Sequence, residues 1–197
     1  MELQAIISTL QRLEKMHRSL LEIALSKTEY VKNNDLDQLD AILKAEQSHV
    51  AAIETFEIQR QQQVQQYMIS KGVQSATEPT ISNLLEVAQG EQFIDDLKAV
   101  RESLLDVLQQ LKTQNDLNQK LVFQSLQFVN VSLNMLRPQA PQEQINYSDK
   151  EVLRQDRVAE NHILIHKHKT HVMLLSMAMR FHLNLKEERL CVLHLWG

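Results

Sequence analysis

The sequence predicts an all-α fold, an antiparallel bundle of long coiled-coil-like helices with one short helix between the second and the last long helix. Three observations support this prediction. The 197 residues include only 3 glycines and 3 prolines, aromatic residues make up 5%, and apolar residues recur at intervals of three and four. Turns and strands need more glycine, proline, β-branched and aromatic residues than this chain supplies, so long helices are expected.

The first long helix is expected from Leu3 to Val31, a length of roughly 45 Å. His17 and Lys27 interrupt its apolar seam. The segment "KNNDLDQL" then supplies the Asn and Asp side chains that favour turns and helix N-caps. A loop this short predicts an antiparallel hairpin of two helices. The seam consists of Leu3, Ile6, Leu10, Leu13, Leu20, Ala24 and Val31.

The second helix is expected to begin near Asp35, and Glu46, Glu57 and Arg60 fall on its apolar grid. A short third helix, "ISNLLEVA", would be capped by Thr77 or Thr80 and closed by Gly90. The grid of the second helix otherwise consists of Leu36, Leu39, Leu43, Val50, Ile53, Val64 and Tyr67.

The fourth helix is expected from about Glu91 to Arg137, because Pro138 disfavours helical geometry at the residue before it. Its second half contains no charged residue between Lys120 and Arg137 and carries two apolar stripes. One stripe can pack on the hairpin, and the other requires a second partner. That partner is the rest of the fold, a second copy of the chain or a client protein. The first stripe is Val122, Leu126, Val129, Leu133 and Leu136; the second is Leu121, Phe128, Val131 and Met135.

Charge and motif content exclude several functional classes. The net charge of −4 is made of interspersed signs without a basic stripe, which argues against nucleic acid as a partner. Export and membrane-insertion signals are not apparent, and the single Cys191 is compatible with a reducing cytoplasm. The sequence has no phosphate-binding glycine loop and no recognisable nucleophile–base motif, so we expect no enzyme and no cofactor.

Two segments resemble the FlgN family of flagellar export chaperones. The first is "KTEYVKNNDLDQLDAILKAEQSHVAAIETFEIQR" (27–60), with Leu36, Leu39, Glu46, Ile53, Glu57 and Arg60 in matching positions. The second is "LQQLKTQNDLNQKLVFQSLQFVNVSLNMLRP" (108–138), with Asn115, Asn118, the "LQF" at Leu126 to Phe128 and the closing "ML-x-P". Together with "INYS" at Ile145 to Ser148, the resemblance covers roughly Met1 to Asp149.

The resemblance implies a cytoplasmic chaperone without catalytic activity, either a monomer or a weak homo-oligomer. Such a chaperone binds the C-terminal helical segments of the hook–filament junction proteins FlgK and FlgL and helps deliver them to the flagellar type III export apparatus. Family clients dock mainly on the C-terminal part of the chaperone. Here that part supplies the candidate client-binding residues Leu117, Leu121, Phe128, Val131, Met135 and Leu136.

Two other functions fit the same helical pattern. A structural coiled-coil protein, such as a homodimer or a tethering subunit, predicts that changes at Phe128 alter the oligomeric state. A type III export chaperone for another client is the second alternative.

The chain is expected to divide into a FlgN-like helical domain, residues 1–149, and an atypical tail, residues 150–197. The tail holds six of the eight histidines, and His162 and His166 would share one face of a helix. Neutral imidazoles at this spacing can bind zinc or nickel, but no "HExxH" motif or cysteine pair supports a site, so no metal is expected. An added amphipathic helix or a non-native extension explains the tail more simply.

Overall fold

The computed structural model describes residues 2–73 and 80–136, and within these ranges every regular element is a helix. The elements are α1 (Glu2–Asn33), α2 (Leu36–Ser70), α3 (Ile81–Val87) and α4 (Ile94–Leu136). The predicted all-α architecture is therefore confirmed, including the short helix between the second and the last long helix.

The turn between α1 and α2 forms as its Asn and Asp residues predict. Asn34 adopts a left-handed conformation (φ 56°), and the N–H of Asp35 donates to the carbonyl of Tyr30. These features end α1 in a Schellman motif, which asparagine tolerates better than most residues. Asp35 then caps α2, because its carboxylate accepts a hydrogen bond of 3.2 Å from the N–H of Gln38.

The third helix is capped by Thr80. The Thr80 hydroxyl accepts from the N–H of Asn83, and the Asn83 side chain accepts from the N–H of Thr80, so a reciprocal capping box forms. The fourth helix begins at Ile94, a few residues later than expected, because Gly90 (φ 83°) and Phe93 (φ 75°) hold the connection in a turn. Thr77 lies outside the described residues.

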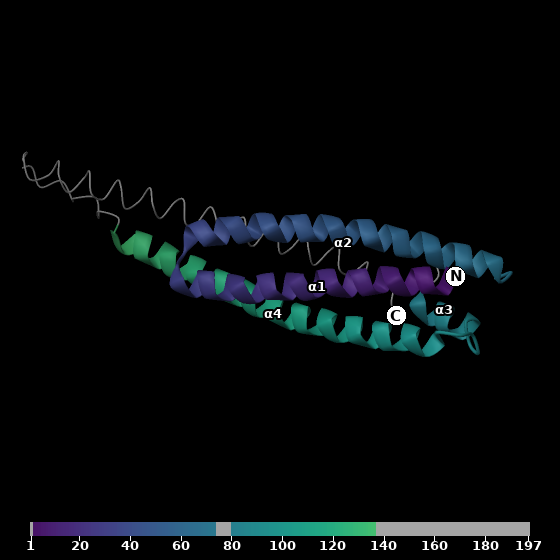
Figure 1. Ribbon diagram of the computed structural model, residues 1–197. Helices are drawn as coiled ribbons and strands as arrows, with labels where there is room; N and C mark the ends of the chain where they lie inside the picture. Colours follow the sequence, from purple (N-terminus) through teal and green to yellow (C-terminus); the bar gives the residue numbers. More distant parts are fainter. Residues whose placement is uncertain (1, 74–79, 137–197) are drawn as a thin grey trace, which may run out of the picture.

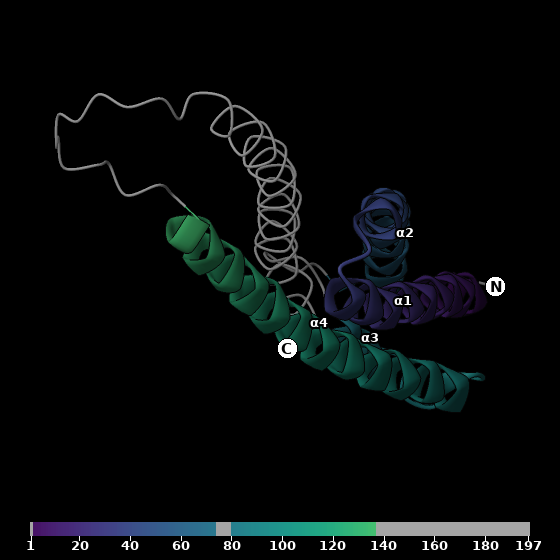
Figure 2. The ribbon, with the colours of Figure 1, turned by 90° about the vertical axis from the view of Figure 1, so that its left-hand side faces the viewer.

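The long helices run up, down and up, with α1 in the middle (Figure 1). The backbone of α1 packs on both α2 and α4, whereas no Cα of α2 lies within 8 Å of a Cα of α4 in the described ranges. Since Thr28 contacts Asn118 and Arg18 contacts Ser103, α1 and α4 run in the same direction. The end of α4 extends past the α1–α2 turn and away from both helices (Figures 1 and 2).

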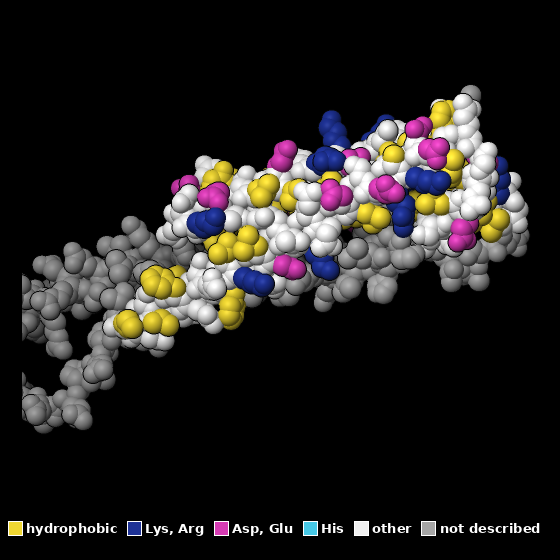
Figure 3. Space-filling model, turned by 90° about the horizontal axis from the view of Figure 1, so that it is seen from below, with side chains coloured by type: hydrophobic (Ala, Val, Ile, Leu, Met, Phe, Trp, Pro, Cys, Tyr) yellow, Lys and Arg dark blue, Asp and Glu magenta, His cyan; other side chains and the backbone are white. Residues whose placement is uncertain are grey.

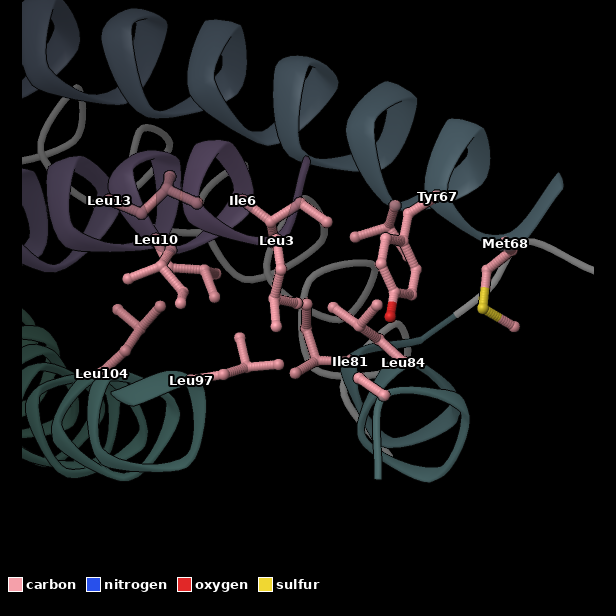
Figure 4. Close-up of a cluster of buried hydrophobic side chains, with 13 residues drawn as sticks. Leu3, Ile6, Leu10, Leu13, Tyr67, Met68, Ile81, Leu84, Leu97 and Leu104 are labelled. Atoms are coloured by element: carbon pink, nitrogen blue, oxygen red, sulfur yellow. The ribbon is translucent and has the colours of Figure 1, made fainter. Parts of the chain in front are cut away.

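The main hydrophobic core fills the opposite end of the molecule, where all four helices meet. Figure 4 shows Leu10 of α1 and Leu104 of α4 on one side of this core and the α3 side chains Ile81 and Leu84 on the other. Each of these four side chains is at most 1% exposed. The short α3 therefore covers the end of the core between α2 and α4.

Several polar residues on the predicted apolar grids are buried rather than exposed. Lys27, expected to interrupt the seam of α1, lies against Glu46 of α2 with its Nζ 2.7 Å from both carboxylate oxygens. His17 is also buried, and its Nδ1 lies 2.7 Å from the carbonyl of Leu13. The carboxylate of Glu57 pairs with the buried Arg60 one turn later. Mutual pairing compensates the cost of removing these charges from water.

Candidate functional site

The last part of α4 has one apolar face turned inward. Val122 packs in a cluster with Val31 of α1 and with Leu39 and Leu43 of α2. Val129, two turns later, is 5% exposed. Leu126 and Leu133, on the same face, are half-buried. The first predicted stripe is therefore the more buried face of α4, and Val122 and Leu126 belong to the cluster shared with α1 and α2. We name Val122, Leu126, Val129 and Leu133 the inner stripe.

The second predicted stripe lies on the other side of the same helix and is largely open to solvent. Phe128 is 74% exposed and Met135 is 80% exposed, while Val131 and Leu117 are about half exposed. Leu121 is half-buried and packs on the edge of the Val122 cluster. Leu136 is the last residue of α4, and its side chain lies outside the described part. We name Leu117, Leu121, Phe128, Val131 and Met135 the outer stripe.

Helix geometry places the outer stripe along one side of α4, where the exposed Gln124 separates Leu121 from Phe128. At about 100° per residue, its five side chains fall within an arc of roughly 80°, and the strip is about 27 Å long. Ser132 lies beside it, and the Ser132 hydroxyl donates to the backbone carbonyl of Phe128 at 2.9 Å. That bond satisfies the hydroxyl within the helix, so Ser132 adds no unmet polar group to the apolar strip.

This end of α4 carries apolar and neutral polar side chains but no charged ones. Residues 121–136 contain no ionisable side chain. Figure 3 shows hydrophobic side chains at the free end of α4, with charged groups only farther along the helix. A surface of this kind offers neither a nucleophile nor an acid or base, but it can bury the apolar face of another helix.

Sequence reasoning missed Leu25, which is half exposed on α1. It lies one heptad after Arg18, whose guanidinium donates to Ser103 of α4 at 3.0 Å. This spacing places Leu25 on the side of α1 that faces α4. Along the shared direction of the two helices, Leu25 lies ahead of Leu117, the first residue of the outer stripe. No signal in the sequence identifies it, because Leu25 lies off the seam grid. Phe123 is also half exposed, but about 140° around α4 from Phe128.

Other candidate sites have no support within the described ranges. No helix there is long and apolar enough to cross a membrane. No group of three or more His, Cys, Asp or Glu side chains is placed to hold a metal ion in residues 2–73 and 80–136. His162, His166 and the rest of the predicted tail, residues 150–197, lie outside the described residues.

Comparison with known proteins agrees with the resemblance noted in the sequence. The family model described as "FlgN protein" matches residues 1–154. A Bacillus subtilis (strain 168) relative, named "Uncharacterized protein YvyG", is 32% identical over 148 residues, which cover 75% of this chain and 88% of the relative. No solved structure matches. The family match spans most of the chain, and we conclude that this protein belongs to the FlgN family of flagellar export chaperones, which is not a family of enzymes.

Proposed function

We propose that this chain is a cytoplasmic chaperone that binds the C-terminal helical segments of the hook–filament junction proteins FlgK and FlgL through the outer stripe. It keeps these subunits soluble and unassembled and delivers them to the flagellar type III export apparatus. The observation that carries this proposal is the exposure of Phe128 and Met135 on an uncharged end of α4.

An amphipathic helix is the partner that fits this strip best. A strip of about 27 Å matches a client helix of roughly 18 residues, whose own apolar positions would recur every three or four residues. Met135 suits such a contact, because a flexible thioether side chain adapts to different partner surfaces. Phe128 is the expected anchor, since a buried aromatic residue contributes about 2 kcal/mol or more at an interface.

The small size of the strip favours reversible binding. A single helix–helix contact lies at the lower end of interface areas, so we expect a Kd on the order of 1 µM, equivalent to about −8 kcal/mol. This affinity permits release at the export apparatus. Because residues 121–136 carry no charge, we also expect the affinity to depend weakly on ionic strength.

The test is isothermal titration of the full-length chain with a peptide of roughly 40 residues, long enough to hold such a helix twice over, from the C-terminus of the same organism's FlgK. We expect saturable one-to-one binding that Phe128→Asp abolishes. Phe123→Asp is the matched control, because Phe123 is also exposed on α4 but faces another direction. An equal loss of binding in both variants would contradict the assignment to the outer stripe.

A complete lack of binding by the wild-type chain, confirmed in a pull-down with intact FlgK and FlgL, would contradict the proposed clients. The homodimeric coiled-coil alternative makes a different prediction for the same variant. In that case, Phe128→Asp would convert a dimer into a monomer in sedimentation velocity, and Phe123→Asp would not. The same two variants therefore separate the two functions.

A further inference from the structure

The distal part of α4 carries two apolar stripes, and hydrophobicity alone does not determine which of them faces inward. The inner and outer stripes are centred about 140° apart around the helix. Both consist of Leu, Val, Phe or Met side chains. A rotation of α4 about its own axis would turn Leu117 and Leu121 toward the other helices and turn Val122, which now packs on α1 and α2, toward solvent.

A pair of directional hydrogen bonds opposes this rotation at the start of the stripes. Asn118 is 2% exposed and faces α1. Its Nδ2 donates to the backbone carbonyl of Ala24 at 2.7 Å, and its Oδ1 accepts from the Thr28 hydroxyl at 2.5 Å. Gln114, one turn earlier on α4, donates to the same Thr28 hydroxyl at 2.5 Å. Rotating α4 would break these bonds and leave buried polar groups unpaired.

Asn115 shows that a buried asparagine does not by itself fix the rotation of α4. It is as deeply buried as Asn118, at 2% exposure, and lies three residues earlier on the same helix. Its side-chain nitrogen and oxygen have no hydrogen-bond partner among the described residues. The two asparagines share residue type, helix and burial, and differ in whether they are bonded to α1.

We propose that Asn118, held by Thr28 and the carbonyl of Ala24, is a positioning residue that sets the rotation of α4 and so keeps the outer stripe turned away from α1 and α2. A single buried polar residue sets the register of coiled coils in the same way, by penalising the alternatives. The value of this exposure for client binding rests on the proposed function, whereas the rotation itself does not.

Cysteine reactivity measures the rotation directly. In full-length protein carrying Cys191→Ser, a single cysteine is placed by Leu117→Cys or by Val122→Cys, and its rate of reaction with a maleimide is followed. Leu117 is 45% exposed and Val122 is 4% exposed, so we expect position 117 to react at least about tenfold faster than position 122, because access controls the reaction of a thiol. Adding Asn118→Leu should slow position 117, speed position 122 and bring the ratio close to one.

The slower reaction at position 117 distinguishes rotation from simple loosening, because a loosened helix would expose both positions. Asn115→Leu is the matched control and should preserve the wild-type ratio. Thr28→Val should act as Asn118→Leu does, while Thr28→Ser retains the hydroxyl and should restore the ratio. Should Asn118→Leu lose its helical circular dichroism, the milder Thr28 pair carries the test. An unchanged ratio in both Asn118→Leu and Thr28→Val would overturn the proposal.

Titration with the FlgK peptide separates this inference from the proposed function. We expect Asn118→Leu to weaken peptide binding about tenfold, equivalent to about 1.4 kcal/mol, because the rotated helix would turn part of the outer stripe away from the peptide. If the wild-type chain binds no peptide but the labelling ratio still collapses in Asn118→Leu, the positioning role stands and the proposed client is wrong. If the peptide binds and the ratio does not change, the client stands and the positioning role is wrong.

Discussion

The two halves of α4 show how one helix can serve two purposes. In the proximal half, Leu97, Leu104 and Leu111 are fully buried against α1 and the other helices. In the distal half, Asn118 and the inner stripe are covered, whereas Phe128 and Met135 face solvent. The proximal half contributes to folding, whereas the distal half keeps an apolar surface available. We name them the core half, residues 94–111, and the open half, residues 117–136.

The difference follows from where the neighbouring helices end. Thr28 contacts Asn118, and α1 ends at Asn33, five residues later, whereas α4 continues for eighteen residues from Asn118 to Leu136. The last roughly 13 residues of α4, about 20 Å, therefore extend beyond α1. A change in the core half should alter stability, and a change in the open half should alter binding.

The largest change in stability is expected at the buried ion pair between Lys27 of α1 and Glu46 of α2. Lys27→Ala leaves Glu46 buried without a partner and should lower the free energy of unfolding by about 3–5 kcal/mol. Urea denaturation followed by circular dichroism measures the change. Lys32→Ala is the control, because its pair with Glu29 is exposed and should contribute about 1 kcal/mol or less. Equal effects of the two variants would show that the Lys27–Glu46 pair is not buried in solution.

The next prediction compares the two halves of α4 directly. Leu104→Ala creates a cavity in the core half and should cost about 2–5 kcal/mol of stability. Phe128→Ala removes a larger side chain from the open half and should change stability by about 0.5 kcal/mol or less. The same urea titration measures both. A loss of several kcal/mol for Phe128→Ala would place its side chain in a core and contradict the assignment of the open half.

A smaller effect is expected at the cap of α3, which closes only the core half. Thr80→Ala removes the hydroxyl that accepts from the N–H of Asn83, while the bond from the backbone N–H of residue 80 to the Asn83 side chain remains, and it should cost about 1 kcal/mol. The midpoint of thermal unfolding measures the loss. Thr55→Ala is the control, because that hydroxyl donates only to the carbonyl of Ala51 within its own helix. Unchanged peptide affinity in Thr80→Ala would support separate roles for the two halves of α4. A weakened affinity would contradict that separation.

The smallest change in stability is expected from the pH dependence of the hydrogen bond between Ser103 and Glu14. The hydrogen bond from Ser103 lowers the pKa of Glu14 below its ordinary value of 4.5, and Arg18 acts in the same direction. Because the folded protein favours the charged carboxylate, this contribution is complete above pH 4.5 and is lost as the pH falls through the lowered pKa. Ser103→Ala should therefore be less stable than wild type at pH 7, by about 1 kcal/mol or less.

Urea titrations at pH 7 and at pH 3 measure this dependence, and the difference between wild type and Ser103→Ala should shrink in acid. Ser26→Ala is the control, because the Ser26 hydroxyl donates only to the carbonyl of Glu22 in its own helix. A difference that grows at low pH would mean that Ser103 stabilises the protonated form of Glu14 instead.

Most of the secondary structure could be predicted because its determinants are local. The turn residues Asn34 and Asp35 and the cap at Thr80 act on backbone groups within a few positions. The start of α4 was predicted a few residues early, since a left-handed conformation at Phe93 has no signal in a single sequence. The partners of the buried polar residues were also missed. Lys27 and Glu46 each looked like an interruption of an apolar grid, because their pairing needs two helices in register.

The helices, the turns between them and the presence of two apolar stripes on α4 follow from the amino-acid sequence, since they depend on residue spacing and on short-range hydrogen bonds. Which stripe is covered follows from the packing of the helices against one another. That choice depends on the end of α1 at Asn33 and on the bonds between Asn118, Thr28 and the carbonyl of Ala24, which join positions far apart in the chain. Hydrophobic burial has no direction, so the choice between two apolar faces requires directional polar contacts.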